Sequence, residues 1–87
     1  MKISPENADA HYNLGSVYHD RGNLTRAVEE YLRALEINPE HRDAHLNLGV
    51  AYYRQGKIEM AIREFEEVLK IDPKNPDAHY NLGVTYR

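Results

Sequence analysis

The sequence predicts an all-α protein, a stack of antiparallel helix hairpins with five helices. Three observations predict it: a 34-residue repeat, helical spacing of the apolar residues within each repeat, and glycine or proline where helices must end. The repeat is plainest in the heptapeptide DAHYNLG, found at 9–15 and at 77–83, with DAHLNLG at 43–49 between them. Repeats of this length indicate hairpins that stack because each one alone leaves an apolar face uncovered.

The period organises the whole chain. Residues 8–41 and 42–75 align without gaps and share 13 of 34 positions. We therefore expect a single array: the tail of a preceding repeat at 1–7, two repeats at 8–41 and 42–75, and the first helix of a truncated third at 76–87. Both ends fall inside a repeat, which favours a segment of a longer array.

The first hairpin is expected to pair helices at 8–21 and 24–37. Asn7 stands where an N-cap acceptor is wanted, Gly22 marks the turn, and proline at 39 disfavours helix in the residue before it. Both helices have apolar residues three and four positions apart. These residues are Ala10, Leu14, Val17 and Tyr18 in the first helix, and Leu24, Ala27, Val28, Tyr31 and Leu35 in the second.

The second hairpin repeats this arrangement one period later, with helices at 42–55 and 58–71, a turn at Gly56 and a stop at Asp72-Pro73. A fifth helix is expected at 76–87. Asn75 is its expected N-cap and Pro76 its first residue, where a missing N–H costs nothing.

The repeated residues resemble the signature of the tetratricopeptide repeat: a large residue, then Leu-Gly, then Tyr, then A-x-x-x-F, then Pro. The first repeat supplies His11, Leu14-Gly15, Tyr18, Ala27, Tyr31 and Pro39, and the second supplies His45, Leu48-Gly49, Tyr52, Ala61, Phe65 and Pro73. The chain departs from the signature where histidine replaces tryptophan and where Val68 replaces a small residue. The resemblance implies a right-handed superhelical stack, an α-solenoid.

Glycine inside a helix costs about 1 kcal/mol relative to alanine, so something must compensate at Gly15 and Gly49. We expect each glycine and its partner alanine, Ala27 or Ala61, to allow close approach of the two helices of a hairpin. The aromatic pairs Tyr18 with Tyr31 and Tyr52 with Phe65 would fill the space beside them.

Composition excludes several classes of function. The formal net charge is −3 and no run of basic residues exceeds two, so a nucleic-acid partner is not expected. No apolar stretch approaches 18 residues and no signal-peptide core is visible, so no membrane partner is expected and the default localisation is cytoplasmic. Cysteine is absent, which removes disulfides and thiolate sites.

No enzyme, cofactor or metal site is predicted. His11, His45 and His79 occupy one repeat position, but equivalent positions in stacked hairpins lie about 20 Å apart, twice the spacing of packed helices. We expect these rings to pack in the core, each with one nitrogen hydrogen-bonded. His41 and His45 have helical spacing but lack a third ligand.

The charged residues are interpreted as solvated helix faces. Acid–base pairs four residues apart support exposed helices, and no recognisable nucleophile motif accompanies them. The pairs are Glu29 with Arg33, Glu59 with Arg63, and Glu66 with Lys70.

The resemblance implies a non-catalytic protein-interaction module whose first helices line a concave groove for a peptide or partner protein. In the family, the groove positions are the second, fifth, sixth, ninth and twelfth of each repeat. Here they are Asp9, Tyr12, Asn13, Ser16 and His19; Asp43, Leu46, Asn47, Val50 and Tyr53; and Asp77, Tyr80, Asn81, Val84 and Arg87.

Two features of this set have alternative interpretations. The repeated asparagines, Asn13, Asn47 and Asn81, could hold a peptide backbone or could bond between neighbouring helices and stiffen the stack. The three aspartates could prefer a basic peptide, although first-turn carboxylates are favoured by the helix dipole in any case. Chaperone C-termini are disfavoured, since the family's clamp needs Lys and Asn where this chain has Tyr12 and Ser16.

The open end of the last helix offers a second surface. His79, Leu82 and Tyr86 have no following helix to cover them, so we expect homo-oligomers through the repeat ends. Two rival functions remain: a trimmed or engineered repeat scaffold that folds and self-assembles without a cognate ligand, and the scaffold arm of a multidomain enzyme.

Overall fold

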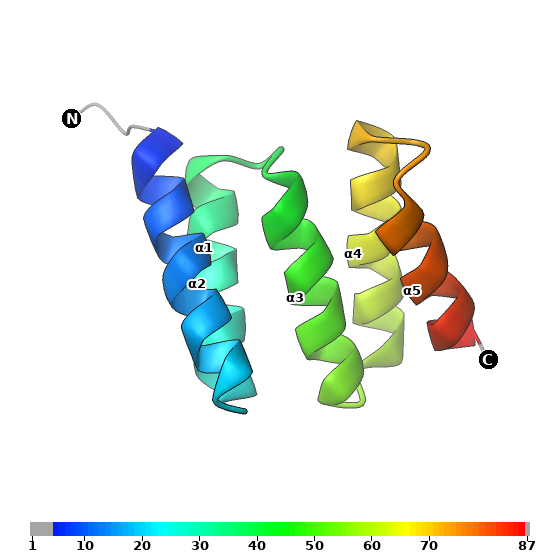
Figure 1. The fold of residues 1–87 in the computed structure, drawn as a ribbon, viewed down its shortest axis with the longest axis horizontal. Coiled ribbons are helices and arrows are strands. Elements are labelled where there is room, and N and C mark those ends of the chain that lie inside the picture. The colour runs from blue at the N-terminus through cyan, green and yellow to red at the C-terminus, as the bar shows by residue number, and fades with distance from the viewer. Residues whose placement is uncertain (1–4, 87) are drawn as a thin grey trace.

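The computed structural model describes residues 5–86, and these residues form five α-helices. The helices are α1 (Pro5–Asp20), α2 (Leu24–Ile37), α3 (Arg42–Arg54), α4 (Ile58–Ile71) and α5 (Pro76–Tyr86). They stand side by side along an elongated body of 43 × 28 × 17 Å, with α1 and α5 at opposite ends of its long axis (Figure 1). The all-α architecture of sequential hairpins is confirmed.

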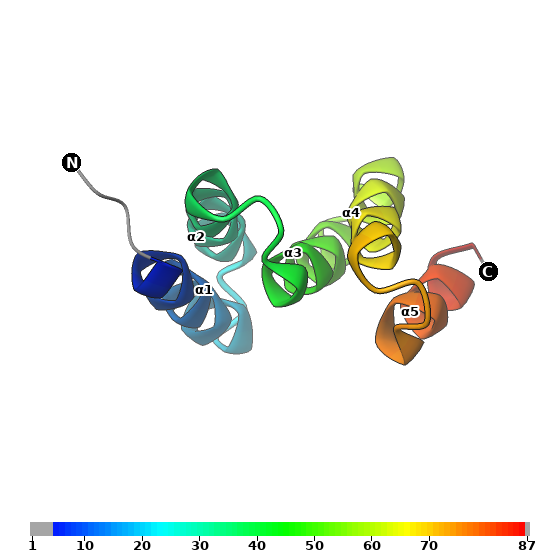
Figure 2. The same ribbon diagram turned by 90° about the horizontal axis from the view of Figure 1, so that it is seen from above.

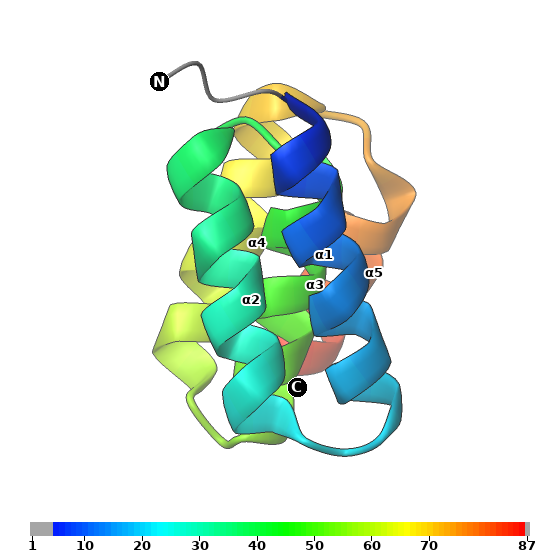
Figure 3. The same ribbon diagram turned by 90° about the vertical axis from the view of Figure 1, so that its left-hand side faces the viewer.

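The helices form two layers. Seen from above, α1, α3 and α5 lie in one layer and α2 and α4 in the other, so the chain zigzags between them (Figure 2). The view along the stack shows the first hairpin in front of the second (Figure 3). The first helices of successive repeats therefore share one face of the molecule.

Helix α1 differs from the expectation because it begins at Pro5, three residues earlier. The prediction that Asn7 caps this helix is wrong, since Asn7 lies inside the first turn. A proline is well suited to a helix start because the first turn has no use for its missing N–H. The earlier start also places Asp9 beyond the first turn, so the dipole interpretation does not apply to it; Asp43 and Asp77 do lie in first turns.

The expected cap of α5 is confirmed. The side-chain oxygen of Asn75 accepts a hydrogen bond from the backbone N–H of Ala78 at 2.9 Å, and Pro76 is the first helical residue. The turns within both hairpins are also as expected. Gly22 and Gly56 have φ angles of +80° and +81°, a region where side chains are strained and glycine is not.

The close approach of the paired helices is confirmed at both mid-helix glycines. A Cβ added at Gly15 would lie 2.7 Å from Cε1 of Tyr31, and one at Gly49 would lie 2.5 Å from Cε1 of Phe65. The aromatic ring of the second helix thus lies directly against the glycine of the first. Tyr31 and Phe65 are essentially fully buried. They belong to one core cluster with Ala27, Leu48, Ala51, Tyr52 and Ala61, against which Tyr18 packs.

The expected surface ion pairs are wrong in detail. Lys70 pairs with Glu67 at 2.7 Å rather than with Glu66, and Glu29 pairs with Arg26 at 3.6 Å rather than with Arg33. Residues three apart are neighbours on a helix as much as residues four apart, so either spacing can form a pair. Within residues 5–86, Glu59 and Arg63 form no pair either.

Candidate functional site

The predicted groove positions lie on the α1, α3 and α5 layer, and their side chains differ in exposure. The half-buried members are Tyr12, Ser16, His19, Leu46, Asn47, Val50, Asn81 and Val84, and the exposed members are Asp9, Asn13, Asp43, Tyr53, Asp77 and Tyr80. Tyr80 is the most open of the large apolar residues at 70% exposure. Arg87 lies outside the described residues.

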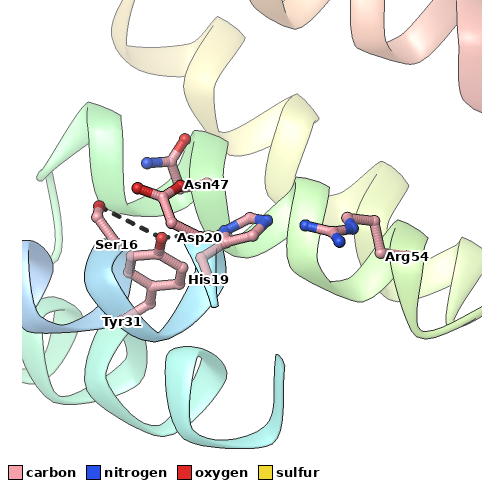
Figure 4. A pocket seen from close by; sticks show the side chains of 6 residues that line it. All are labelled: Ser16, His19, Asp20, Tyr31, Asn47 and Arg54. Atoms are coloured by element: carbon pink, nitrogen blue, oxygen red, sulfur yellow. Dashed lines mark hydrogen bonds between the residues drawn. The ribbon is translucent and has the colours of Figure 1, made fainter. Parts of the chain in front are cut away.

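A pocket of about 220 Å³ is lined by side chains from α1, α2 and α3 (Figure 4). Its walls are polar. The lining residues are Ser16, His19, Asp20, Tyr31, Asn47 and Arg54. Three of them, Ser16, His19 and Asn47, belong to the predicted groove set. The other three were missed by the sequence interpretation.

Tyr31 reaches the pocket from the second layer. Its ring passes over Gly15, and its hydroxyl group lies 3.1 Å from Nδ1 of His19 and 3.4 Å from Oγ of Ser16, within hydrogen-bonding distance of both. The family signature has Phe here, so the sequence marked Tyr31 as a packing residue. The signal that could have revealed its second role is Phe65, which fills the equivalent position without a hydroxyl group.

The electrostatics of the pocket can be followed at its two titratable rings. Burial, and next the positive charge of Arg54, lower the pKa of His19, while Asp20 opposes this with a smaller effect. Burial raises the pKa of Tyr31 above its ordinary value of 10.0, and the negative charge of Asp20 adds to that rise. At neutral pH the pocket therefore contains a neutral imidazole and a neutral phenol between one cation and one anion.

Asn47 joins the two repeats across the groove. Its side-chain N–H donates a hydrogen bond to the hydroxyl group of Tyr12 at 3.0 Å, which ties α3 to α1. The Tyr12 ring also lies 5.9 Å from the Tyr31 ring and 5.0 Å from that of His41, measured between centroids. This bond matches the stiffening interpretation for Asn47. Asn13 is exposed and forms no such link within the described residues.

His41 caps α3, a role that the sequence did not indicate. Its Nδ1 accepts the backbone N–H of Ala44 at 3.1 Å, so the ring proton must be on Nε2. That Nε2–H then donates to the Asp9 carboxylate at 2.8 Å. Asp9 is therefore engaged in a contact between repeats.

The three histidines at the repeated position are hydrogen-bonded, as expected, and two of them contact glutamates that repeat with the same period. Nδ1 of His11 lies 2.8 Å from Glu30 and Nδ1 of His45 lies 2.7 Å from Glu64. Nε2 of His45 also donates to the carbonyl of Pro39, and Nε2 of His79 to that of Pro73. Only His45 is buried; His11 is half-buried and His79 is exposed, so core packing is confirmed for the middle repeat alone.

The end face on α5 is only partly as expected. Tyr86 is 65% exposed and His79 is exposed, but Leu82 is half-buried because it packs against the core cluster. The prediction that Leu82 is uncovered is therefore wrong. In residues 5–86 there is no group of three His, Asp or Glu side chains placed to hold a metal ion. No helix in that range is both long enough and apolar enough to cross a bilayer.

The five stacked helices define a class, the helical-hairpin repeat proteins. A family model described as TPR repeat matches residues 15–56 and 51–87. The chain therefore belongs to the tetratricopeptide repeat family, and that assignment is confirmed.

Solved structures of the same family are similar over nearly the whole chain. One is YrrB, described as a TPR protein with an unusual peptide-binding site, at 34% identity and a TM-score of 0.86, covering 92% of this chain and 41% of that one. Another is the second TPR domain of human RPAP3 in complex with the HSP70 peptide SGPTIEEVD, at 25% identity and a TM-score of 0.90, covering 93% and 68%. A third is MamA, at 29% identity and a TM-score of 0.90, covering 95% of this chain and 48% of that one.

The chain spans 41 to 68% of the length of these three chains. No curated protein matches it.

Proposed function

We propose that this chain is a non-catalytic module that binds an extended peptide segment in the groove lined by α1, α3 and α5. The observation that carries the proposal is the open polar pocket between α1 and α3, formed in part by side chains at groove positions. Structural neighbours support it, since human RPAP3 holds a peptide and YrrB has a peptide-binding site. Tetratricopeptide modules are typically binding domains rather than enzymes.

The groove is largely preformed. Hydrogen bonds from Asn47 to Tyr12 and from His41 to Asp9 fix α3 against α1 without a ligand, so little ordering free energy is lost on binding. Exposed Tyr53 and Tyr80 then offer rigid contact area, of the kind that contributes most at interfaces. Chaperone C-termini are not the expected ligand, because Tyr12 and Ser16 stand where the family's clamp for them needs Lys and Asn.

The test selects binders from a displayed library of random peptides and measures their affinity for two matched variants. Tyr80→Ala removes an exposed ring from the groove layer, whereas Met60→Ala removes an exposed apolar side chain from α4 in the other layer. We expect Tyr80→Ala to weaken binding about tenfold or more, as interface aromatics do, and Met60→Ala to leave it unchanged. Melting temperatures should be equal. Selection of no peptide, or equal losses in both variants, contradicts the proposal.

A second candidate function, self-association through the end of α5, rests on a separate observation. Tyr86 is 65% exposed, and a Cβ at Gly83 would meet nothing within 4 Å, in contrast to Gly15 and Gly49. A second copy covering this face would bury both. Sedimentation velocity should then show dimers that Tyr86→Gln abolishes; a monomer at millimolar concentration would exclude this function.

A further inference from the structure

The residues that line the pocket at the first repeat boundary differ from their equivalents at the next. Between α1 and α3 it is lined by Ser16, His19, Asp20, Tyr31 and Asn47, together with Arg54. One period later the five equivalent positions hold Val50, Tyr53, Arg54, Phe65 and Asn81. Of the five, only the asparagine is the same, so the polar character of the pocket is not a requirement of the repeat.

The hydroxyl group of Tyr31 is not needed for packing. Phe65 fills the corresponding space against Gly49 as tightly as Tyr31 does against Gly15. A hydroxyl group in a fully buried residue is costly unless it is hydrogen-bonded. Here it bonds to Ser16 and His19, whose side chains also line the pocket. Tyr31, although fully buried, thus fixes the side chains of Ser16 and His19 at the pocket wall.

The two formal charges of the pocket oppose each other. Arg54 comes from α3 and Asp20 from α1, and both line the same 220 Å³. The guanidinium of Arg54 points toward the His19 ring (Figure 4), and after burial its charge is the next cause that lowers the pKa of His19, which Asp20 opposes. The C-terminal ends of α1 and α3 add partial negative charge near Asp20 and Arg54.

A bound group with a full charge would be attracted by one of the two residues, Arg54 and Asp20, and repelled by the other. A group with an acceptor and a donor side by side would match both. We propose that this pocket binds the carboxamide of a glutamine or asparagine side chain on the peptide held in the groove. The oxygen of the amide accepts from Arg54 and from the imidazole N–H, and its NH₂ group donates to Asp20.

The pocket has room for such a group, since 220 Å³ corresponds to about seven water molecules at about 30 Å³ each. A site whose donors and acceptors are all satisfied by an amide discriminates strongly against ligands that leave those groups unpaired. This inference rests on the proposed function, because it names the side chain that a groove-bound peptide would place there.

The probes are four blocked peptides, Ac-Ala-Xaa-Ala-NHCH₃, in which Xaa is Gln, Glu, Lys or Met. The C-terminal N-methylamide keeps a primary carboxamide out of the Glu, Lys and Met probes. Each is titrated into ¹⁵N-labelled protein, and binding is followed through the amide resonances of Ser16, His19, Asn47 and Arg54. The Gln peptide should shift these resonances and bind about threefold to tenfold more tightly than each of the others, the factor expected for one hydrogen bond of ordinary net strength.

Two single-charge variants sharpen the test, because each should change the preference rather than abolish binding. Arg54→Gln leaves Asp20 unopposed, so the Lys peptide should become the tightest. Asp20→Asn leaves Arg54 unopposed, so the Glu peptide should become the tightest. Tyr31→Phe removes the hydroxyl group that holds His19 and Ser16 in place, and it should weaken the Gln peptide about threefold. Arg63→Gln, an exposed change on α4, is the matched control and should leave all four affinities unaltered.

The outcomes separate this inference from the proposed function. If the Glu, Lys or Met peptide binds most tightly to the unaltered protein, or if no pocket resonance shifts at millimolar peptide, the carboxamide proposal is overturned. If library peptides bind in the groove without preference at this pocket, only the carboxamide proposal fails. If the Gln peptide shifts the pocket resonances while the library yields no binder, the carboxamide site stands and the peptide-groove function fails.

Discussion

The two hairpins of this protein have the same backbone plan and different chemistry on one face. In both, a glycine at the middle of the first helix lies against an aromatic ring of the second, and a left-handed glycine closes the turn. The rings differ, since Tyr31 has a hydroxyl group that reaches the groove and Phe65 has none. The polar pocket therefore combines Ser16, His19, Asp20 and Tyr31 of the first hairpin with Asn47 and Arg54 of the second.

This difference shows how a repeat protein separates stability from recognition. Gly15 and Gly49, which repeat, lie where an added Cβ would collide with an aromatic ring, and Ala27 and Ala61, which also repeat, are fully buried. Three of the five groove positions change between the two repeats, from Tyr12, Ser16 and His19 to Leu46, Val50 and Tyr53. We infer that packing fixes the repeated residues, whereas the groove is free to differ at each repeat.

The largest expected effect comes from filling the space at a repeated position. A Cβ at Gly49 would lie 2.5 Å from the Phe65 ring, whereas one at Gly83 in α5 meets nothing within 4 Å. Gly49→Ala should lower the free energy of unfolding by about 2 kcal/mol, as overpacked cores do. Gly83→Ala should raise it by about 0.5 kcal/mol through helix propensity. Urea denaturation followed by circular dichroism measures both, and equal effects of the two changes would contradict the packing argument.

An exchange of the two rings tests the difference between the hairpins directly. Phe65→Tyr would bring a hydroxyl group to a boundary where Val50 and Tyr53 replace Ser16 and His19. Because this hydroxyl group would be unpaired, the free energy of unfolding should fall by about 1 to 2 kcal/mol. Tyr31→Phe removes a hydrogen-bonded hydroxyl group and should lower the free energy of unfolding by about 0.5 to 1 kcal/mol. The ratio of the two losses in urea denaturation is the informative quantity. A stabilising Phe65→Tyr change would show that the boundaries are interchangeable.

A smaller difference is expected between two of the repeated asparagines. Asn47 donates to Tyr12 across the repeats, so Asn47→Ala should lower the unfolding free energy by about 1 kcal/mol, the worth of one hydrogen bond. Asn13 is exposed, and Asn13→Ala should stay within about 0.5 kcal/mol. If thermal melting shows the same loss for both, the bond to Tyr12 does not stiffen the stack.

The smallest predicted effect is a dependence of stability on pH that originates in the second hairpin. The hydrogen bond to Glu64 raises the pKa of His45, and both ring nitrogens face acceptor oxygens, an arrangement that suits the protonated ring. Because the folded pKa is raised above 6.5, this stabilisation is fully present below pH 6.5 and is lost as the pH rises through the folded value.

The free energy of unfolding should therefore decrease from pH 6 to pH 8, and His45→Gln should flatten that slope. Urea titrations at several pH values, with His79→Gln as the exposed control at the equivalent position, measure it. A slope of the opposite sign, or one that persists in His45→Gln, would contradict the assignment.

Much of the fold could be predicted from the chain because its determinants are local and repeated. The turns at Gly22 and Gly56 follow from backbone freedom, and the start of α5 follows from Asn75 and Pro76. The start of α1 differs from the prediction because the 34-residue period places Pro5 in register with Pro39 and Pro73, which follow helices, although a proline is equally able to begin one. Periodicity cannot distinguish these two uses.

The site was predicted less completely. The groove positions came from the family resemblance, and three of them, Ser16, His19 and Asn47, do line the pocket. Tyr31, Asp20 and Arg54 were missed because they come from the second layer or from helix ends, outside the repeat positions that the resemblance names. Their convergence depends on the angle at which α2 crosses α1 and on the placement of α3 beside them.

By itself, the sequence determined the number of helices, their order and their pairing, since a hairpin of fixed length must stack to cover its apolar face. The tertiary structure alone decided which polar side chains meet. His41 caps α3 and binds Asp9 32 positions earlier in the chain, and Tyr31 passes over Gly15 to reach Ser16 and His19. Such contacts join different helices, so they depend on distances and directions that only the packed helices set.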